Sequence, residues 1–338
     1  GTRGRAPYDA VLTHGFVLDQ QGRKMSKSLG NITAPQKVIN EFGADILRLW
    51  VVGSDYYDDL RIGKEILVRH SDHYRRLRNT LRYLLGALNE FDEKEKIDFA
   101  EMPELEKWVL HRVSELSKKI EVNTEKFNLH DIYLDIHNFC TIDLSAFYFD
   151  IRKDTLYCEE LNGIERRSCR TVMDILFQSL TTWLAPIICF TAEEAWQSRY
   201  NDKENSVHLQ TYYKADKAWE NNLIGKKWSE IRELRSVVTT AIEEKRKEGL
   251  LGSSLQAKVI IQADENTLNK LSDINLPDIF ICSEVETKIN SSKDETNFSV
   301  TIELASGGKC QRCWKIVKEV KDENELCNRC SGVLNKIK

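Results

Sequence analysis

The sequence predicts a mainly α-helical protein with a short α/β segment at its start and a small α+β region near its end. Between residues 62 and 200, apolar residues recur at spacings of three and four, which is typical of amphipathic helices. From residue 255 the apolar period falls to two, which is typical of strands. A cluster of four cysteines follows. We therefore expect four parts: 1–60, 61–220, 221–305 and 306–338.

Residues 1–60 predict the end of an α/β domain rather than a whole one. Residues 10–18 are mostly apolar and expected to be extended, and residues 19–22 are expected to form a turn. After Pro35, the apolar pattern indicates short packed helices around Gly43. A doubly wound sheet needs several strands and crossovers, and this segment has too few.

Residues 61–220 predict an antiparallel helical bundle. Long amphipathic stretches joined by short loops cover 66–88, 104–120, 129–151 and 163–184. Thr191, with Glu194 three residues later, has the pattern of a capping box at the start of a fifth helix. Five tryptophans are expected to lie in the core: Trp108, Trp183, Trp196, Trp219 and Trp228.

Residues 221–305 predict a small α+β domain. A helix over 221–248 is expected to stop at Gly249. The alternating segments 255–261 and 298–304, with 279–281 between them, indicate a small sheet packed on at least one helix. Residues 290–297 are polar and are expected to form a mobile loop.

The composition of this 338-residue chain limits its function classes. Charged residues make up 30% and hydrophobic residues 41%, and the net charge is -4, so a nucleic-acid surface would have to be a local patch. No apolar run approaches the roughly 20 residues that a membrane span needs. The chain begins without an initiator Met or a signal segment, so we expect a cytoplasmic piece of a longer polypeptide.

The segment Lys24-Met25-Ser26-Lys27-Ser28 is the first candidate site. Gly22 and Gly30 bracket it and can take backbone angles that other residues avoid. Such a mobile loop offers ammonium and hydroxyl donors to a polyphosphate. The alternative is a solvated basic turn, which is what most charge runs are.

The second candidate is a metal site with the pattern Cys310-x2-Cys313-x13-Cys327-x2-Cys330. Two such knuckles place four thiolates tetrahedrally around Zn²⁺ at about 2.3 Å, and a site closed in this way is structural. A redox role is the alternative, but a redox site needs one Cys-x-x-Cys rather than two. An odd total of nine cysteines argues against a disulfide framework.

Two basic segments are candidate RNA contacts. In the helix predicted from residue 66, and just before it, cations outnumber anions. The cysteine-rich tail combines basic side chains with an aromatic one, which suits phosphate contact and base stacking. Solvated surface is the alternative for both. The candidate residues are Arg69, Arg75, Arg76, Arg78, Arg82, Arg312, Trp314 and Lys315.

The chain resembles isoleucyl-tRNA synthetases of the bacterial type, which are class I aminoacyl-tRNA synthetases. The matching segments are residues 4–8 (GRAPY), 11–16 (VLTHGF), 22–31 (GRKMSKSLGN), 43–50 (GADILRLW) and 54–56 (SDY). Valyl and leucyl enzymes share the loop and the bundle but generally lack a four-cysteine C-terminal finger. The resemblance is strong over residues 1 to about 65 and across the tail, and weaker between them.

The resemblance implies a role for each part. Residues 1–60 would end a Rossmann-type catalytic domain, 61–220 would bind the anticodon, and 306–338 would be a zinc finger that supports tRNA binding. Lys27 and Lys24 would be catalytic. With Ser26 and Ser28 they would bind ATP, which is expected to bring Mg²⁺. The parent enzyme would form isoleucyl adenylate and transfer the acyl group to tRNA-Ile, and we expect it to be a monomer.

The family's other ATP motif, His-x-Gly-His, is missing from the sequence. The only histidines spaced by three are His70 and His73, which lie on the apolar stripe of a predicted helix and are expected to be packing residues. We therefore expect this chain alone to be inactive as a ligase. The alternatives are a non-catalytic tRNA-binding module, the valyl or leucyl family, and a zinc-stabilised protein scaffold without RNA.

Overall fold

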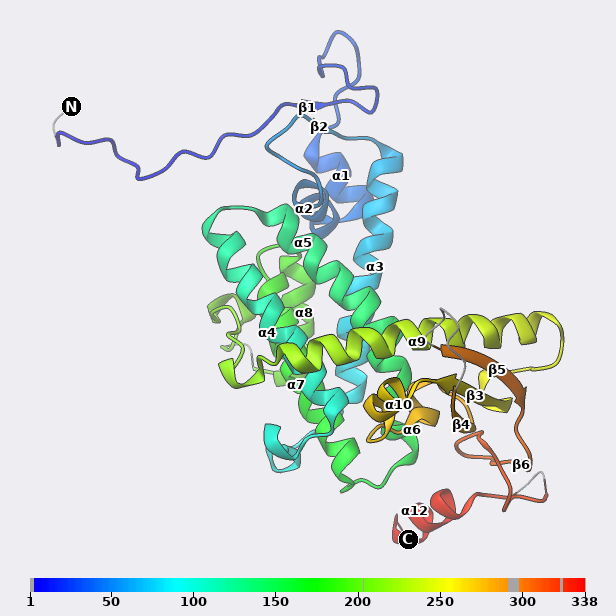
Figure 1. The fold of residues 1–338 in the computed structure, drawn as a ribbon. Helices are drawn as coiled ribbons and strands as arrows, with labels where there is room; N and C mark the ends of the chain where they lie inside the picture. Colours follow the sequence, from blue (N-terminus) through cyan, green and yellow to red (C-terminus); the bar gives the residue numbers. More distant parts are fainter. Residues whose placement is uncertain (1–2, 203, 291–297, 323–324, 338) are drawn as a thin grey trace. The chain divides into compact units, whose positions relative to one another are not determined.

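The structure is a computed structural model that describes residues 3–202, 204–290, 298–322 and 325–337. Figure 1 shows the order of its elements. The helices and strands are β1 (Val17–Leu18), α1 (Pro35–Phe42), α2 (Ala44–Gly53), β2 (Leu60–Arg61), α3 (Lys64–Ala87), α4 (Glu104–Glu125), α5 (Leu129–Asn138), α6 (Phe149–Cys158), α7 (Ile164–Leu184), α8 (Cys189–Tyr200), α9 (Asn222–Lys247), β3 (Ala257–Ala263), α10 (Glu265–Leu271), α11 (Leu276–Ile279), β4 (Glu284–Ile289), β5 (Phe298–Leu304), β6 (Gly308–Lys309), β7 (Ile316–Val317) and α12 (Asn328–Ile337).

The chain divides into two compact units, each assembled from separate stretches of sequence. The first unit consists of Gly1–Asn89, Glu115–Leu144 and Asp174–Ala215. The second consists of Glu90–Ser114, Ser145–Met173 and Asp216–Lys338.

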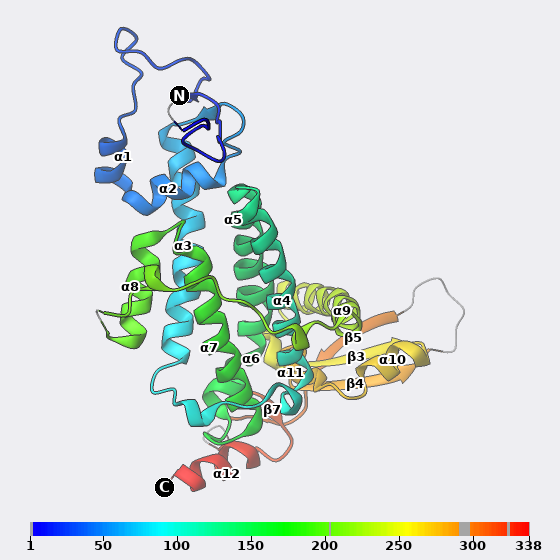
Figure 2. The same cartoon turned by 90° about the vertical axis from the view of Figure 1, so that its left-hand side faces the viewer.

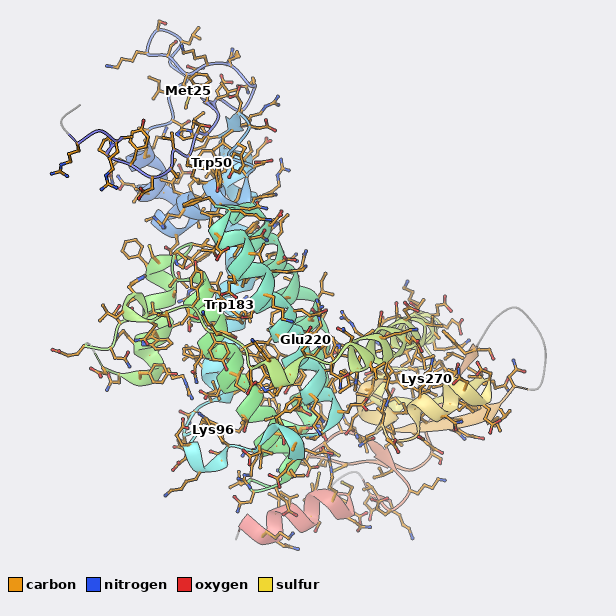
Figure 3. The ribbon with its side chains drawn as sticks, turned by 60° about the vertical axis from the view of Figure 1, so that its left-hand side comes forward. Met25, Trp50, Lys96, Trp183, Glu220 and Lys270 are labelled. Carbon is orange, nitrogen blue, oxygen red and sulfur yellow. The ribbon has the colours of Figure 1, made fainter. Side chains whose placement is uncertain are left out.

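The first unit contains the lysine-serine segment and the short helices predicted around Gly43. That glycine has φ +97°, which lets the chain turn between α1 and α2. Helix α2 packs against α1, α3, α5 and α8, and α3 lies beside α8 (Figure 2). An apolar cluster around Trp50 and Leu67 also takes in Met25 from the lysine-serine segment; Figure 3 labels Met25 and Trp50.

The predicted long helices are present. Helices α3, α4 and α7 cover the predicted stretches, and the five tryptophans are buried as predicted. The helix predicted over 129–151 runs further, from 129 to 158, and is interrupted by a π-helical stretch, Phe139–Tyr148. Periodicity does not reveal this stretch, because the apolar pattern continues while the hydrogen-bond register widens.

The capping box predicted at Thr191 and Glu194 is wrong. Helix α8 begins two residues before Thr191, and Ile188 at its N-cap provides no side-chain cap. The hydroxyl of Thr191 donates instead to Asp45 of α2, at 2.6 Å. A carboxylate distant in sequence has therefore taken over the capping role that the local pattern suggested.

The second unit contains the predicted small sheet, but one of its strands was placed wrongly. Strand β3 is central, parallel to β4 and antiparallel to β5, with α9 packed against β5. The segment 279–281 is not a strand, because α11 ends there and buries Ile279 and Phe280. The third strand is β4, whose alternating charges at Glu284, Glu286 and Lys288 suit an edge strand and conceal it from an apolar-pattern search.

Two further expectations concern loops and membranes. Residues 291–297, most of the predicted mobile loop, lie outside the described residues. Among the residues that the structure does describe, no helix combines the length and apolarity needed to span a membrane.

Candidate functional site

The lysine-serine loop is braced by one buried carboxylate at its base. Asp19, which is 5% exposed, accepts the backbone N–H of Arg23 at 2.8 Å and the side-chain amide of Asn31 at 2.9 Å. The Asn31 amide oxygen accepts the N–H of Ser26 at 2.9 Å. The hydrogen bond from Asn31, followed by that from Arg23, lowers the pKa of Asp19 to about 2. Asp19 and Asn31 therefore tie the two ends of the loop together.

Two glycines allow the loop to turn. Gly22 has φ +78° and Gly30 has φ +64°, values that an L side chain rarely adopts. Between them Met25 points into the apolar cluster, and its sulfur lies 3.4 Å from the N–H of Thr33. The loop therefore has a partly buried apolar anchor at its centre and polar side chains on either side.

The charged side chains of the loop are exposed. Lys24 and Lys27 form no ion pair with any part of the chain that the structure describes. The hydroxyls of Ser26 and Ser28 lie 3.1 Å apart. Unpaired ammonium groups beside two hydroxyls can receive the oxygens of a polyphosphate without first breaking an internal contact.

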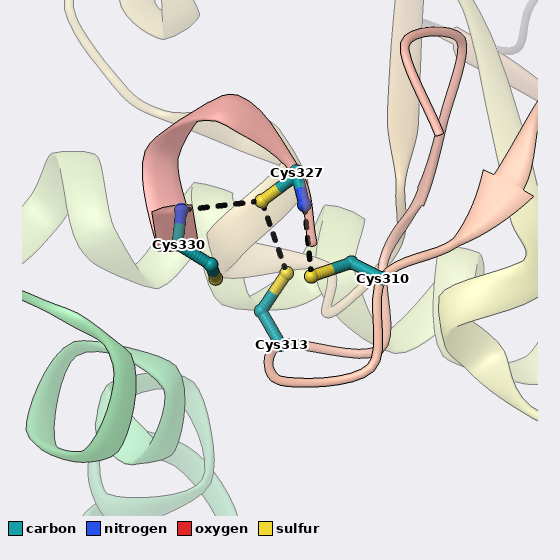
Figure 4. Close-up of side chains that lie close together, drawn as sticks. All are labelled: Cys310, Cys313, Cys327 and Cys330. Carbon is teal, nitrogen blue, oxygen red and sulfur yellow. Dashed lines mark hydrogen bonds between the residues drawn. The ribbon is translucent and has the colours of Figure 1, made fainter. Parts of the chain in front are cut away.

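The four cysteines of the tail converge as their spacing predicts. Their sulfurs all lie within 4.8 Å of one another, and each of the four residues is buried (Figure 4). Cys310 and Cys313 lie on the turn between β6 and β7, while Cys327 precedes α12 and Cys330 lies within it.

This arrangement fits a tetrahedral metal ion. Four Zn–S bonds of about 2.3 Å require sulfurs about 3.8 Å apart. The sulfurs of Cys313 and Cys327 are 3.8 Å apart. Burial raises the pKa of the Cys310 thiol, but backbone N–H groups, led by that of Cys327, outweigh burial and lower it to about 6. Cys158 of α6 packs against the same cluster.

The five candidate arginines of α3 differ in their contacts. Arg75 pairs with Asp72 at 2.9 Å, and Arg78 pairs with Glu194 at 3.4 Å. The other three are exposed and make no ion pair within the described residues: Arg69, Arg76 and Arg82. Among the α3 candidates, these three guanidinium groups can therefore contact a phosphate backbone without first breaking an ion pair.

The candidates of the tail are engaged to different degrees. Arg312 donates to the carbonyls of Cys158 and Tyr157, at 2.8 and 3.1 Å, and Lys315 pairs with Asp278 at 2.6 Å. Trp314 remains 58% exposed. Its backbone has φ +64°, which is unusual for a bulky residue, and the Lys309 ammonium lies 5.6 Å from its ring centre.

Sequence reasoning missed three of the residues that shape these sites. Asp19 and Asn31 flank the loop, and Cys158 borders the cysteine cluster from a distant helix. An Asp at the start of a turn is a common local signal, so Asp19 had a clue in the sequence. Asn31 and Cys158 act through contacts that no local pattern reveals.

Three family models match the chain. The model of the anticodon-binding domain of tRNA ligase matches residues 106–261. That of class I tRNA synthetases (I, L, M and V) matches residues 1–63, and that of the zinc finger found in FPG and IleRS matches residues 307–331.

Curated relatives cover almost the whole chain. The isoleucine–tRNA ligase of Zymomonas mobilis is 47% identical over 99% of this chain, and that of Gluconobacter oxydans is 46% identical over 99%. That of Agrobacterium fabrum is 48% identical over 94%. The chain spans about a third of their length, 35%, 35% and 34% respectively. A solved LeuRS–tRNA–LeuAMS complex from Agrobacterium radiobacter aligns with 62% of this chain and 24% of its own, at TM-score 0.49 and 18% identity. On the sequence matches, the chain belongs to the isoleucine–tRNA ligase family of class I tRNA synthetases.

Proposed function

We propose that this chain is the loop-bearing, tRNA-binding part of an ATP-dependent isoleucine–tRNA ligase. The main support is the braced loop, which holds Lys24 and Lys27 exposed and without ion pairs to any residue that the structure describes. The names of the relatives support isoleucine as the amino acid and tRNA as its acceptor. The whole protein would form isoleucyl adenylate and then pass the acyl group to tRNA-Ile.

The loop chemistry follows from where charge develops. The isoleucine carboxylate attacks the α-phosphate of ATP, and pyrophosphate leaves with growing negative charge. Lys27 and Lys24 would meet that charge more closely in the transition state than in the ground state, which lowers the barrier. The hydroxyls of Ser26 and Ser28 would help to hold the nucleotide, with which Mg²⁺ is expected.

The test replaces one lysine in the full-length protein. Lys27→Ala should slow isoleucine-dependent ATP–pyrophosphate exchange by about 100-fold or more, the scale of a lost transition-state contact. Isoleucine binding should change far less. Lys37→Ala, which removes an exposed lysine from the neighbouring helix α1, is the charge-matched control. An unchanged exchange rate in Lys27→Ala would remove Lys27 from the mechanism.

The other parts support this function in their own ways. We assign 1–60 to the end of the catalytic domain, 61–220 to anticodon binding, 221–305 to a junction domain and 306–338 to a zinc finger. Zn²⁺ held by Cys310, Cys313, Cys327 and Cys330 would supply folding energy rather than chemistry, since four thiolates leave no open position. Exposed Trp314 would stack on a base, whereas Arg312 and Lys315 would support the knuckle that presents it.

By itself the chain would act as a tRNA-binding module, because His-x-Gly-His is absent from its sequence. Exchange activity in the full-length protein, combined with salt-sensitive tRNA binding but no exchange by this chain, would support that division of work. We expect the full-length protein to be a cytoplasmic monomer.

A further inference from the structure

Helix α2 holds the start of helix α8 through one buried carboxylate. Asp45, which is 7% exposed, accepts the backbone N–H groups of Phe190 and Thr191, at 3.2 and 2.8 Å. It also accepts the Thr191 hydroxyl at 2.6 Å. These N–H groups belong to the first turn of a twelve-residue helix, where backbone donors lack partners and the helix dipole favours an anion.

The same face of α2 holds the turn before α8 through a cation. Arg48, one helical turn after Asp45, donates from Nη2 to the carbonyl of Pro186 at 2.6 Å and from Nε to that of Ile187 at 3.1 Å. The Asp45 carboxylate thus accepts hydrogen bonds from N–H groups at the start of α8, and the Arg48 guanidinium donates to carbonyls of the turn before it. We call Asp45 and Arg48 the α2 clasp.

The α2 clasp also reaches the arginine-bearing helix α3. The Thr191 hydroxyl, which donates to Asp45, lies 2.8 Å from the hydroxyl of Tyr74 and can accept from it. Tyr74 lies in α3 between Arg69 and Arg76, two of the arginines that form no ion pair in the described part of the chain. One buried junction therefore joins α2, α8 and the tRNA-facing candidates of α3.

At its other end, α2 is tied to the lysine-serine loop. The indole N–H of Trp50 donates to the carbonyl of Arg61 in β2 at 3.0 Å. Arg61 is paired with Leu18 in β1, and Asp19, which braces the loop, is the next residue. Helix α2 therefore contacts both the strand that leads into the loop and the junction with α3 and α8.

We infer that Asp45 and Arg48 are positioning residues that hold the lysine-serine loop and the tRNA-binding helices in one geometry. This inference rests on the proposed function. Transfer of the acyl group to tRNA requires tRNA bound on the helices and adenylate formed at the loop in register. Formation of the adenylate requires only the loop. Breaking the α2 clasp should therefore separate the two activities.

The experiment uses the full-length protein with Asp45→Asn, Arg48→Gln and the double variant. Isoleucine-dependent pyrophosphate exchange, measured without tRNA, should stay within about twofold of the unchanged protein. The aminoacylation kcat/KM for tRNA-Ile should fall by about tenfold in each single variant. In the double variant kcat/KM should fall little further than in the single variants, because both residues hold the same segment at the start of α8. Glu41→Gln, an exposed carboxylate on α1 paired with Lys64, is the matched control.

Each result decides the inference. If the variants lose exchange and aminoacylation equally, the inference is wrong, because the residues would then serve the loop alone. If the variants aminoacylate at the rate of the unchanged protein, the inference is also wrong. If Asp45→Asn does not fold, Arg48→Gln, whose side chain is partly exposed, gives the same comparison. Absence of isoleucine-dependent exchange in the unchanged protein would overturn the proposed function instead.

Discussion

At the scale of single residues, Asp19 determines how the lysine-serine loop presents its charges. Its carboxylate receives donors from both ends of the loop, and Asn31 connects it to the backbone of Ser26. Neither residue projects its side chain outward as Lys24 and Lys27 do. Their contribution is to reduce the conformations that the loop samples before a nucleotide arrives.

Replacing Asp19 by Asn tests this bracing role. The amide keeps the size of the side chain but loses the charge and one of its acceptor positions, so the loop should become less ordered. We expect pyrophosphate exchange in the full-length protein to slow about tenfold, as for a misplaced rather than a missing contact group. The KM for ATP should rise. Asp9→Asn, an exposed substitution in the same part of the chain, is the control and should leave the exchange rate and the KM unchanged. Exchange at the normal rate in Asp19→Asn would contradict the bracing role.

At the scale of elements, the sequence predicted the structure where apolar periodicity decided it. The long helices and the alternating strands β3 and β5 came from buried stripes that local sequence encodes. Strand β4 was missed because its pairing with β3 depends on backbone hydrogen bonds and cross-strand ion pairs such as Lys258–Glu286. The capping box at Thr191 failed because Asp45 takes over the role, and a residue so distant in sequence leaves no local pattern.

The candidate sites followed the same rule. The spacing of the cysteines predicted that their sulfurs converge, because each Cys-x-x-Cys pair lies within four consecutive residues. The ATP-binding role of the lysine-serine segment stays a prediction. The sequence did not predict the contacts of Arg312 and Lys315, because both side chains bind segments that are distant in sequence, around Cys158 and Asp278. A basic residue near a zinc knuckle can therefore be structural even where its type suits RNA.

Histidines between α3 and α5 make the stability of the first unit depend on pH. The Nδ1 atom of His70 is buried and has no hydrogen-bond partner among the described residues. Burial, with the positive charges of His73 and Arg69, lowers the pKa of His70 from 6.5 to about 4. Burial also lowers the pKa values of His73 and His137. Between pH 6.5 and 4 the unfolded chain binds more protons, so the free energy of unfolding falls as pH drops through this window.

Urea unfolding at several pH values between neutral and mildly acidic tests this dependence. The free energy of unfolding should be at its full value above the ordinary histidine pKa and should decline below it. His70→Phe keeps a ring but cannot titrate, so its decline should be shallower. His14→Phe, an exposed substitution, should leave the slope unchanged. An equally steep decline in His70→Phe would show that other groups carry the dependence.

At the scale of the whole molecule, the proposed binding of tRNA by an acidic protein would require a local basic surface. The net charge is -4, yet Arg69, Arg76 and Arg82 of α3 form no ion pair within the described residues. Replacing all three by Gln should weaken tRNA-Ile binding. It should also make the slope of log K against log salt shallower by about 2, because each lost phosphate contact removes roughly 0.7–0.9.

A salt titration with tRNA-Ile, tRNA-Val and tRNA-Met measures both affinity and preference. The control is Arg75→Gln with Arg78→Gln, whose charges already face Asp72 and Glu194. We expect this pair to change the slope less than the triple variant does. A slope that is identical in the triple variant and the unchanged protein would place the tRNA elsewhere.

Zinc removal should affect the second unit locally rather than throughout. Metal binding in small fingers contributes about 10–16 kcal/mol at neutral pH, far more than so short a segment gains from its own apolar contacts. Chelation in the intact protein should therefore disorder the chain from about Lys309 onward. The helices α4, α6 and α7 have their own buried side chains, including Trp108 and Phe177, and should remain folded.

Cys158 is an internal reporter of that local unfolding. It is 5% exposed and packed against the four-cysteine cluster, so loss of the finger uncovers it. Alkylation mapped by mass spectrometry should label Cys158 after chelation and not before. Cys169, fully buried within α7, should stay unlabelled in both states. If the metal leaves while Cys158 stays protected and the tail resists protease, then protein contacts rather than zinc hold the finger folded. If Cys169 is labelled as well, the metal also stabilises the helices.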